Sequence, residues 1–176
     1  SSSSSKRLYF EDKVQICDNI SPYLIPGPNI YCVPVDSPIS DLPPMRMGSN
    51  AVDGKRLILE RTDVEAILSK FPEASRFIRQ YGGTQELLSG IHRWCVWIED
   101  GELSKAKEIE PLRRIIEECR MYREGAGRDA RKSARRPHAF CYSTFEPVDF
   151  IHVGNTIGNA LPFVPAELKR GGYVSN

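Results

Sequence analysis

The clearest alternation of apolar and polar positions along the chain runs from His92 to Ile98. Every second residue from Trp94 to Ile98 is apolar, which is the spacing of one face of a half-buried β-strand. A Gly-Gly break, the short run Gln85–Leu88 and a Ser-Gly turn signal come before it. The pattern therefore predicts a strand behind a turn near the middle of the chain.

Two helices are predicted around Pro72. Thr62 and Glu65 have the spacing of a capping box, so a helix should begin there and end before Pro72, because the residue before a proline disfavours the helical region. A second, short helix is predicted to begin at Pro72. The apolar residues that these two helices would bury are Val64, Ile67, Leu68, Ala74, Phe77 and Ile78.

A longer helix is predicted from Pro111. Its apolar stripe consists of Leu112, Ile115, Ile116 and Cys119, and the basic residues predicted to flank that stripe are Arg113, Arg114, Arg120 and Arg123. Glycines at 125 and 127 interrupt this helix, and a second, basic segment follows from Arg128 to Arg136, where Pro137 closes it.

Short extended segments are expected in the rest of the chain. Seven prolines between residues 22 and 44 exclude long helices from that stretch. Ser1–Ser5 has nothing to bury and is predicted to be a linker or an edge introduced by cloning. Extended segments or strands are predicted at Lys6–Cys17, Asn29–Val35, Arg56–Leu59, Ala139–Phe145, Phe150–Val153 and Pro162–Val164. Helices mixed with short strands indicate a mixed α+β fold.

The composition limits the class of protein. A chain of 176 residues, 40% of them hydrophobic, can bury one real core. Its five cysteines are widely separated and never form a CxxC pair, so neither a disulfide framework nor a zinc ribbon is expected. No apolar run approaches the roughly 20 residues that cross a bilayer, and no signal peptide is recognisable. A cytoplasmic protein without a membrane partner is expected.

Charge is unevenly distributed although the formal net charge is only +1. Residues 113–136 hold nine basic and four acidic side chains, a local net charge of +5, which leaves −4 for the remainder. Cations at three- and four-residue spacing would form a ridge suited to a phosphate backbone. These cations are Arg128, Arg131, Lys132, Arg135 and Arg136. The alternatives are a solvated face or a surface that docks on an acidic partner.

Residues that could read DNA bases lie on two loops. Basic and amide side chains recognise base edges in the major groove. The first loop offers Arg46, Asn50, Lys55 and Arg56, and the second, between Gly154 and Asn159, offers Asn155 and Asn159. The alternative interpretation is that the asparagines serve turns.

The sequence contains few recognisable catalytic motifs. It contains no GxGxxG, P-loop, GxSxG or HExxH motif, and its three histidines are isolated from one another. Cys95 lies within the predicted central strand and is expected to be a buried structural thiol. Of the two tryptophans, which point to opposite faces, Trp94 is expected in the core and Trp97 under a cover or at a domain interface. We therefore expect no catalytic residue and no metal site, although a stand-alone enzyme with an unrecognised site stays open as an alternative.

Several segments together resemble one known family. The stretch FPEASRFIRQYGGTQELLSGIHRWCVWIED is the most specific, and NISPYLIPGPNIYC, RRPHAF and FVPAELKRGGYVSN extend the similarity over nearly the whole chain. They resemble the target-recognition domain of MmeI-like (type IIG/IIL) restriction-modification enzymes, which fuse an adenine-specific DNA methyltransferase to a nuclease. The departures are the turn Asp53-Gly54-Lys55 and a weak match from Phe145 to Gly158, which put the geometry of those loops in doubt.

The resemblance implies a fold, a function and partners. It implies a single target-recognition-type domain over residues 6–176 that continues past Asn176 in the parent protein. Such a domain binds double-stranded DNA beside the methyltransferase core of the same polypeptide and positions a target adenine for methylation. S-adenosylmethionine would be bound by that core, so no cofactor is expected within this chain.

Overall fold

The computed structural model describes residues 5–10, 12–37, 40–41, 43–155 and 163–176. The chain forms two compact units, residues 1–45 and residues 46–176, which we call unit 1 and unit 2. Among the described residues, no helix is long and apolar enough to cross a membrane.

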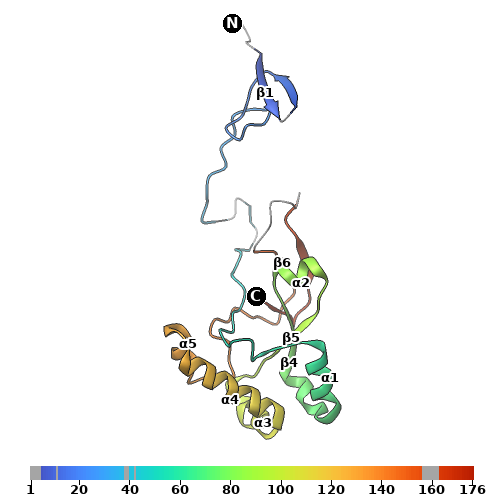
Figure 1. Cartoon of the computed structure of the whole chain (residues 1–176), viewed down its shortest axis with the longest axis vertical. Helices are drawn as coiled ribbons and strands as arrows, with labels where there is room; N and C mark the ends of the chain where they lie inside the picture. Colours follow the sequence, from blue (N-terminus) through green and yellow to red (C-terminus); the bar gives the residue numbers. More distant parts are fainter. Residues whose placement is uncertain (1–4, 11, 38–39, 42, 156–162) are drawn as a thin grey trace. The chain divides into compact units, whose positions relative to one another are not determined.

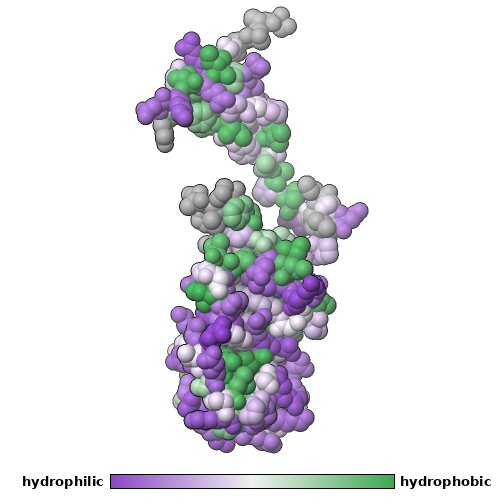
Figure 2. All heavy atoms as spheres, turned by 90° about the vertical axis from the view of Figure 1, so that its right-hand side faces the viewer, coloured by the Kyte–Doolittle hydropathy of each residue, from purple (hydrophilic) through white to green (hydrophobic). Residues whose placement is uncertain are grey.

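Unit 1 is built on a β-hairpin. Its strands, β1 (Lys6–Phe10) and β2 (Lys13–Cys17), are antiparallel with Tyr9 opposite Val14. Leu8 is buried on one face, whereas Tyr9 and Val14 on the other face are 67% and 56% exposed. Apolar side chains are accordingly visible at the surface of this unit (Figure 2). The described part of residues 18–45 contains no helix, as the prolines predict.

A four-stranded sheet forms the centre of unit 2 (Figure 1). Its order is β3 (Ile58–Leu59), β5 (Arg93–Val96), β4 (Ile78–Gly82) and β8 (Val174–Ser175). β5 is antiparallel to both of its neighbours, and β8 runs parallel to β4. A separate antiparallel ribbon pairs β6 (Phe150–Val153) with β7 (Ala166–Lys169).

Helices of unit 2 flank the central sheet on two sides. In Figure 1, α1 is drawn on one side of β4 and β5, and the run from α3 to α5 on the other. Their bounds are α1 Arg61–Lys70, the 3-10 helix η1 Pro72–Phe77, α2 Thr84–Ser89, the 3-10 helix η2 Asp100–Glu102, α3 Leu103–Glu108, α4 Glu110–Gly125 and α5 Arg128–Ser133. The mixed α+β fold class is confirmed.

One hydrophobic core joins sheet and helices. Its buried members run from Ala51 to Val174 in sequence. As predicted, η1 buries Ala74 and Phe77, and α4 buries its apolar stripe. Trp94 and Trp97 are both partly buried against this core. Trp97 packs on Phe140 and Phe145 at ring-centroid distances of 5.2 and 4.8 Å, so it is covered as expected.

Several local predictions were wrong. The first helix is capped two residues earlier than Thr62 suggests, since the Glu60 backbone N–H donates to Asp63 Oδ2 at 3.0 Å. Residues 139–145 do not form a strand, because only Tyr142 makes a β-bridge, with Asn50. Strands β7 and β8 were not foreseen. The predicted strand at residues 162–164 begins outside the described residues.

Candidate nucleic-acid interface

α5 carries part of the basic ridge that the sequence predicts: Arg128, Arg131 and Lys132 lie on the helix, which ends at Ser133, and Arg135 and Arg136 follow it. This helix follows α4 directly, with Gly127 just before its first residue. Ala130 is 3% exposed and anchors the helix, so the longer basic side chains around it face outward. Among the described residues, four cations line an open pocket of about 500 Å³: Arg128, Arg131, Lys132 and Arg135. Four of the five predicted phosphate-binding residues are thus brought together.

Most of these cations have no acidic partner. Arg131 Nε donates to the carbonyl oxygen of Ala126 at 3.0 Å, which orients its guanidinium group beside the helix. In the described part of the chain, no carboxylate forms an ion pair with Arg128, Arg131, Lys132 or Arg135. The pocket therefore carries uncompensated positive charge and can attract an anion such as a phosphate.

Arg136, the fifth predicted cation, is engaged elsewhere. Its Nη2 lies 2.9 and 2.8 Å from the two carboxylate oxygens of Asp100. The buried His138 places Nε2 2.8 Å from the same carboxylate. Hydrogen bonds from Arg136, then from His138, hold the pKa of Asp100 below its usual value. Arg136 is consequently neutralised by an internal ion pair.

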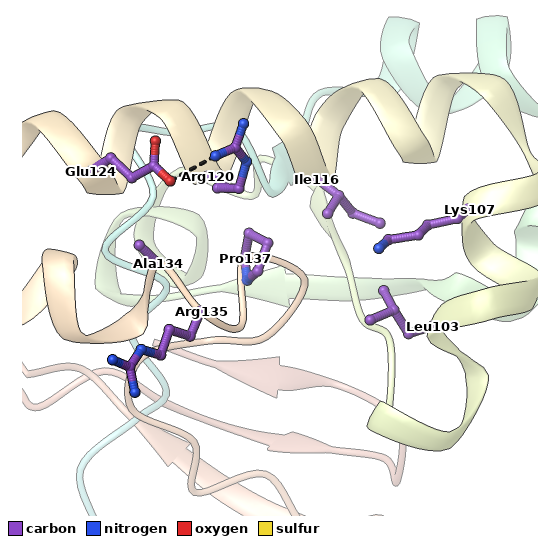
Figure 3. A pocket seen from close by; sticks show the side chains of 8 residues that line it. All are labelled: Leu103, Lys107, Ile116, Arg120, Glu124, Ala134, Arg135 and Pro137. Carbon is purple, nitrogen blue, oxygen red and sulfur yellow. Dashed lines mark hydrogen bonds and ion pairs between the residues drawn. The ribbon is translucent and has the colours of Figure 1, made fainter.

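A second groove, beside the residues that follow α5, contains both polar and apolar side chains (Figure 3). It has a volume of about 370 Å³ between α3, α4 and the turn that follows α5. Arg120 at its rim is paired with Glu124 on α4 at 2.7 Å. Arg135 contributes to this groove as well as to the cation-lined pocket.

The first predicted base-reading loop forms a tight turn at residues 50–56. Asn50 Oδ1 accepts a hydrogen bond from the Val52 backbone N–H at 3.1 Å, which is the turn-supporting role proposed as the alternative. The backbone φ angles of Val52, Gly54 and Lys55 are +46°, +61° and +64°. Such angles are unfavourable for a β-branched residue such as Val52. Contacts both within the turn and from outside it are therefore needed to hold this backbone.

Three further contacts fix the loop. The buried carboxylate of Asp53 accepts hydrogen bonds from the backbone N–H groups of Lys55, at 3.1 Å, and Leu57. The Arg56 guanidinium group lies over the ring of Tyr122, 5.7 Å from its centroid. Lys55 remains exposed. At the start of the loop, exposed Arg46 is paired with Glu146. Lys55 is thus the least constrained of the four predicted side chains.

Arg123 does not lie on the exposed surface of α4, where the sequence predicts it. We predicted that it flanks the apolar stripe of α4, but its side chain is fully buried at 0% exposure. It lies four residues after Cys119 and seven after Ile116, so it continues the buried stripe by one more turn. This helical spacing is the signal in the sequence that indicates burial of Arg123. The positive charge of the side chain favoured an exposed position instead.

The second predicted base-reading loop belongs to another part of unit 2. Exposed Asn155 follows β6, and its backbone N–H donates to Thr84 Oγ1 at 2.8 Å. Asn159 lies outside the described residues. The role of Asn155 stays a prediction.

The described residues hold few groups suited to catalysis. No cluster of three or more His, Cys, Asp or Glu side chains among them has an arrangement that could hold a metal ion. Cys95 is fully buried, and burial raises the pKa of its thiol to about 12, so it remains a protonated core residue. The chemistry that the cation-lined pocket supports is the binding of anions.

Comparisons with known proteins point to one family. The family model described as "MmeI, target recognition domain" matches residues 26–176. DNA methyltransferase A of Bacillus subtilis (strain 168) is 30% identical over 120 residues, which is 68% of this chain and 14% of that protein. A type IIL restriction-modification enzyme, MmeI, solved in complex with DNA, matches with a TM-score of 0.77 and 22% identity. That match covers 99% of this chain and 24% of the MmeI chain. The chain thus spans a small part of both relatives, and it belongs to the family of MmeI target recognition domains.

Proposed function

We propose that this chain recognises duplex DNA on behalf of an adenine-specific DNA methyltransferase, reading base pairs beside the adenine to be methylated. The observation that carries the proposal is the pocket whose described lining consists of Arg128, Arg131, Lys132 and Arg135, in a member of this family. Such a cluster can neutralise phosphates, and each neutralised phosphate releases counterions. Most of the affinity would come from this interaction.

The methyl transfer itself is proposed to occur outside this chain. S-adenosylmethionine would be held by a methyltransferase core in the same polypeptide, and the target adenine would be flipped out of the duplex into that core. The exposed face of the unit 1 hairpin, with Tyr9, Val14 and Ile16, is consistent with a neighbouring domain that covers it.

A direct test is a fluorescence-anisotropy titration with a randomised 30-base-pair duplex at several salt concentrations. Single-stranded DNA and polyglutamate serve as competitors. A DNA-reading domain should favour duplex DNA over polyglutamate and then show a preference among selected duplex sequences. Equal binding to polyglutamate, without sequence preference, would instead support a protein-interaction surface that docks on an acidic partner.

The cation-lined pocket makes a specific prediction. Replacement of Arg131, Lys132 and Arg135 by Ala should weaken binding about equally for all duplex sequences, since interactions with phosphates carry no sequence information. The slope of log K against log salt should become shallower by roughly 0.9 for each phosphate that is no longer neutralised. The measurement is the same titration repeated at four salt concentrations.

The matched control replaces Lys105, Arg113 and Arg114 by Ala. These three cations are also exposed, but they lie on α3 and the first turns of α4, away from α5. The control removes the same charge and should leave most of the slope in place. An unchanged slope in the α5 variant, or an equal reduction in both variants, would remove α5 from the proposed interface.

A further inference from the structure

Arg123 uses its whole hydrogen-bonding capacity inside the protein. A guanidinium group has five N–H donors. Nε donates to the carbonyl of Val52 at 3.2 Å, and Nη2 donates to the carbonyls of Ala51 and Ala139 at 2.6 and 2.8 Å. Nη1 donates to the carbonyls of Ser133 and Arg136 at 3.1 and 2.9 Å. Each donor thus has a backbone acceptor.

This arrangement is specific to arginine. Within the described residues no carboxylate forms an ion pair with Arg123, so five carbonyl dipoles compensate its buried charge. Burial of a charge without such compensation is strongly unfavourable. A lysine could supply only three donors and lacks the planar fork that reaches two segments at once. Substitution by lysine should therefore leave carbonyls unsatisfied.

The five carbonyls come from the two segments that carry most of the predicted DNA-binding residues. Ala51 and Val52 belong to the strained turn that presents Lys55 and Arg56. The other three carbonyls belong to residues 133–139. This segment begins at Ser133, the last residue of α5, and contains Arg135. Turn and helix are far apart in sequence, and one buried side chain ties both to the last turn of α4.

The neighbouring residue strengthens this tie. Gly54, in the left-handed conformation, lies against the ring of Tyr122, so closely that an added methyl carbon would be 2.6 Å from it. Two consecutive residues of α4, Tyr122 and Arg123, therefore hold the turn at residues 51–56. A strained backbone persists only where its surroundings over-determine it, and such sites are often functional.

We infer that Arg123 is a positioning residue that locks the turn at residues 51–56 and the basic helix α5 into one rigid DNA-contacting unit. This inference rests on the proposed function. Its consequence is that the sequence preference depends on Arg123, whereas the salt-dependent attraction of α5 for any duplex does not. Base-edge recognition needs fixed geometry, while attraction between charges tolerates movement.

The test compares Arg123→Lys with Arg120→Lys, one turn earlier on the same helix. Arg120 is only half-buried, pairs with Glu117 and Glu124, and serves as the matched control. First, amide hydrogen exchange is measured without DNA. Arg123→Lys should speed exchange at least about tenfold, both in residues 51–57 and in residues 133–139, with β4 and β5 unchanged. Arg120→Lys should change neither segment.

Second, the duplex that the wild-type chain prefers is selected, and its affinity is compared with that for a randomised duplex. Arg123→Lys should lower this preference about tenfold, the amount that one base pair typically contributes. The salt slope on randomised duplex should match that of the wild type. Faster exchange in both segments with an unchanged preference would overturn the role in DNA recognition, and unchanged exchange would overturn the coupling itself.

Two further outcomes are informative. If Arg123→Lys also speeds exchange in β4 and β5, the substitution has loosened the whole fold, and Gly54→Ala takes its place because it displaces the turn and leaves Arg123 intact. A normal preference in Gly54→Ala would then overturn the inference. If the wild-type chain itself shows no preference, the proposed function fails, while the exchange comparison still reports on the coupling.

Discussion

At the scale of single residues, Asp100 determines how many cations near α5 stay free. Its carboxylate accepts three hydrogen bonds from Arg136 and lies 2.8 Å from His138 Nε2. Its pKa is lowered by these bonds, so the carboxylate stays charged and its contribution to stability is lost only as the pH falls through that lowered value. At neutral pH, Asp100 therefore competes with any phosphate for Arg136 through an exposed ion pair.

Replacement of Asp100 by Asn should release this cation. We expect tighter binding to randomised duplex at low salt and a salt slope steeper by about 0.9, because one more phosphate can be neutralised. The control is Asp149→Asn. Asp149 also has a lowered pKa through Arg170, at 2.6 Å, and Gly171, but it precedes β6 rather than facing α5. An equal change in both variants would mean that only net charge matters.

The cysteines should differ sharply in reactivity. Burial raises the pKa of the Cys95 thiol from 9.0 to about 12 and that of Cys119 to about 11, so their reactive thiolate forms are rare at neutral pH. Three pKa units correspond to a thiolate fraction about a thousandfold lower. Cys32 is exposed. At pH 8 an alkylating reagent should label Cys32 first and reach Cys95 and Cys119 only in denaturant, with mass spectrometry as the readout.

At the scale of elements, periodic patterns were predictable and pairings over long sequence distances were not. The stripe of α4 is visible in the sequence because this helix buries one face, whereas β5 buries residues of both faces, since the adjacent Cys95 and Val96 are both 0% exposed. Strand β8 has only two residues and is defined by its pairing with β4, so no local pattern reveals it. The basic spacing of α5 predicted its ridge, but the capture of Arg136 by Asp100 and the burial of Arg123 depend on tertiary contacts.

The parallel pairing of β8 with β4 can be tested by one substitution. Val174 is fully buried in the core, and Val174→Ala should lower the free energy of unfolding by about 2 kcal/mol through reduced apolar burial and the cavity left behind. Val148→Ala, at a residue that is 52% exposed, should cost far less. Chemical denaturation of both variants measures the difference. Equal effects would show that β8 does not contribute to the core.

At the scale of the whole molecule, the two units have very different means of stabilisation. All buried members of the hydrophobic core lie between Ala51 and Val174, which is within unit 2. In the described residues of unit 1, Leu8 is the one buried hydrophobic side chain. A segment of about 45 residues with so little burial is below the size that usually folds unaided. Unit 1 therefore needs a neighbouring domain over its exposed apolar side chains in order to fold stably, whereas unit 2 does not.

Separate production of the two units tests this difference. Residues 46–176 should unfold cooperatively with the same denaturation midpoint as the full chain, because their core is complete. Residues 1–45 should show no cooperative transition, since Tyr9, Val14 and Ile16 are 67%, 56% and 67% exposed on one face of the hairpin. A lower midpoint for residues 46–176 would mean that unit 2 depends on unit 1. A cooperative transition in residues 1–45 would mean that the exposed apolar face needs no neighbouring domain, and it would remove the hairpin from the proposed contact with a methyltransferase core.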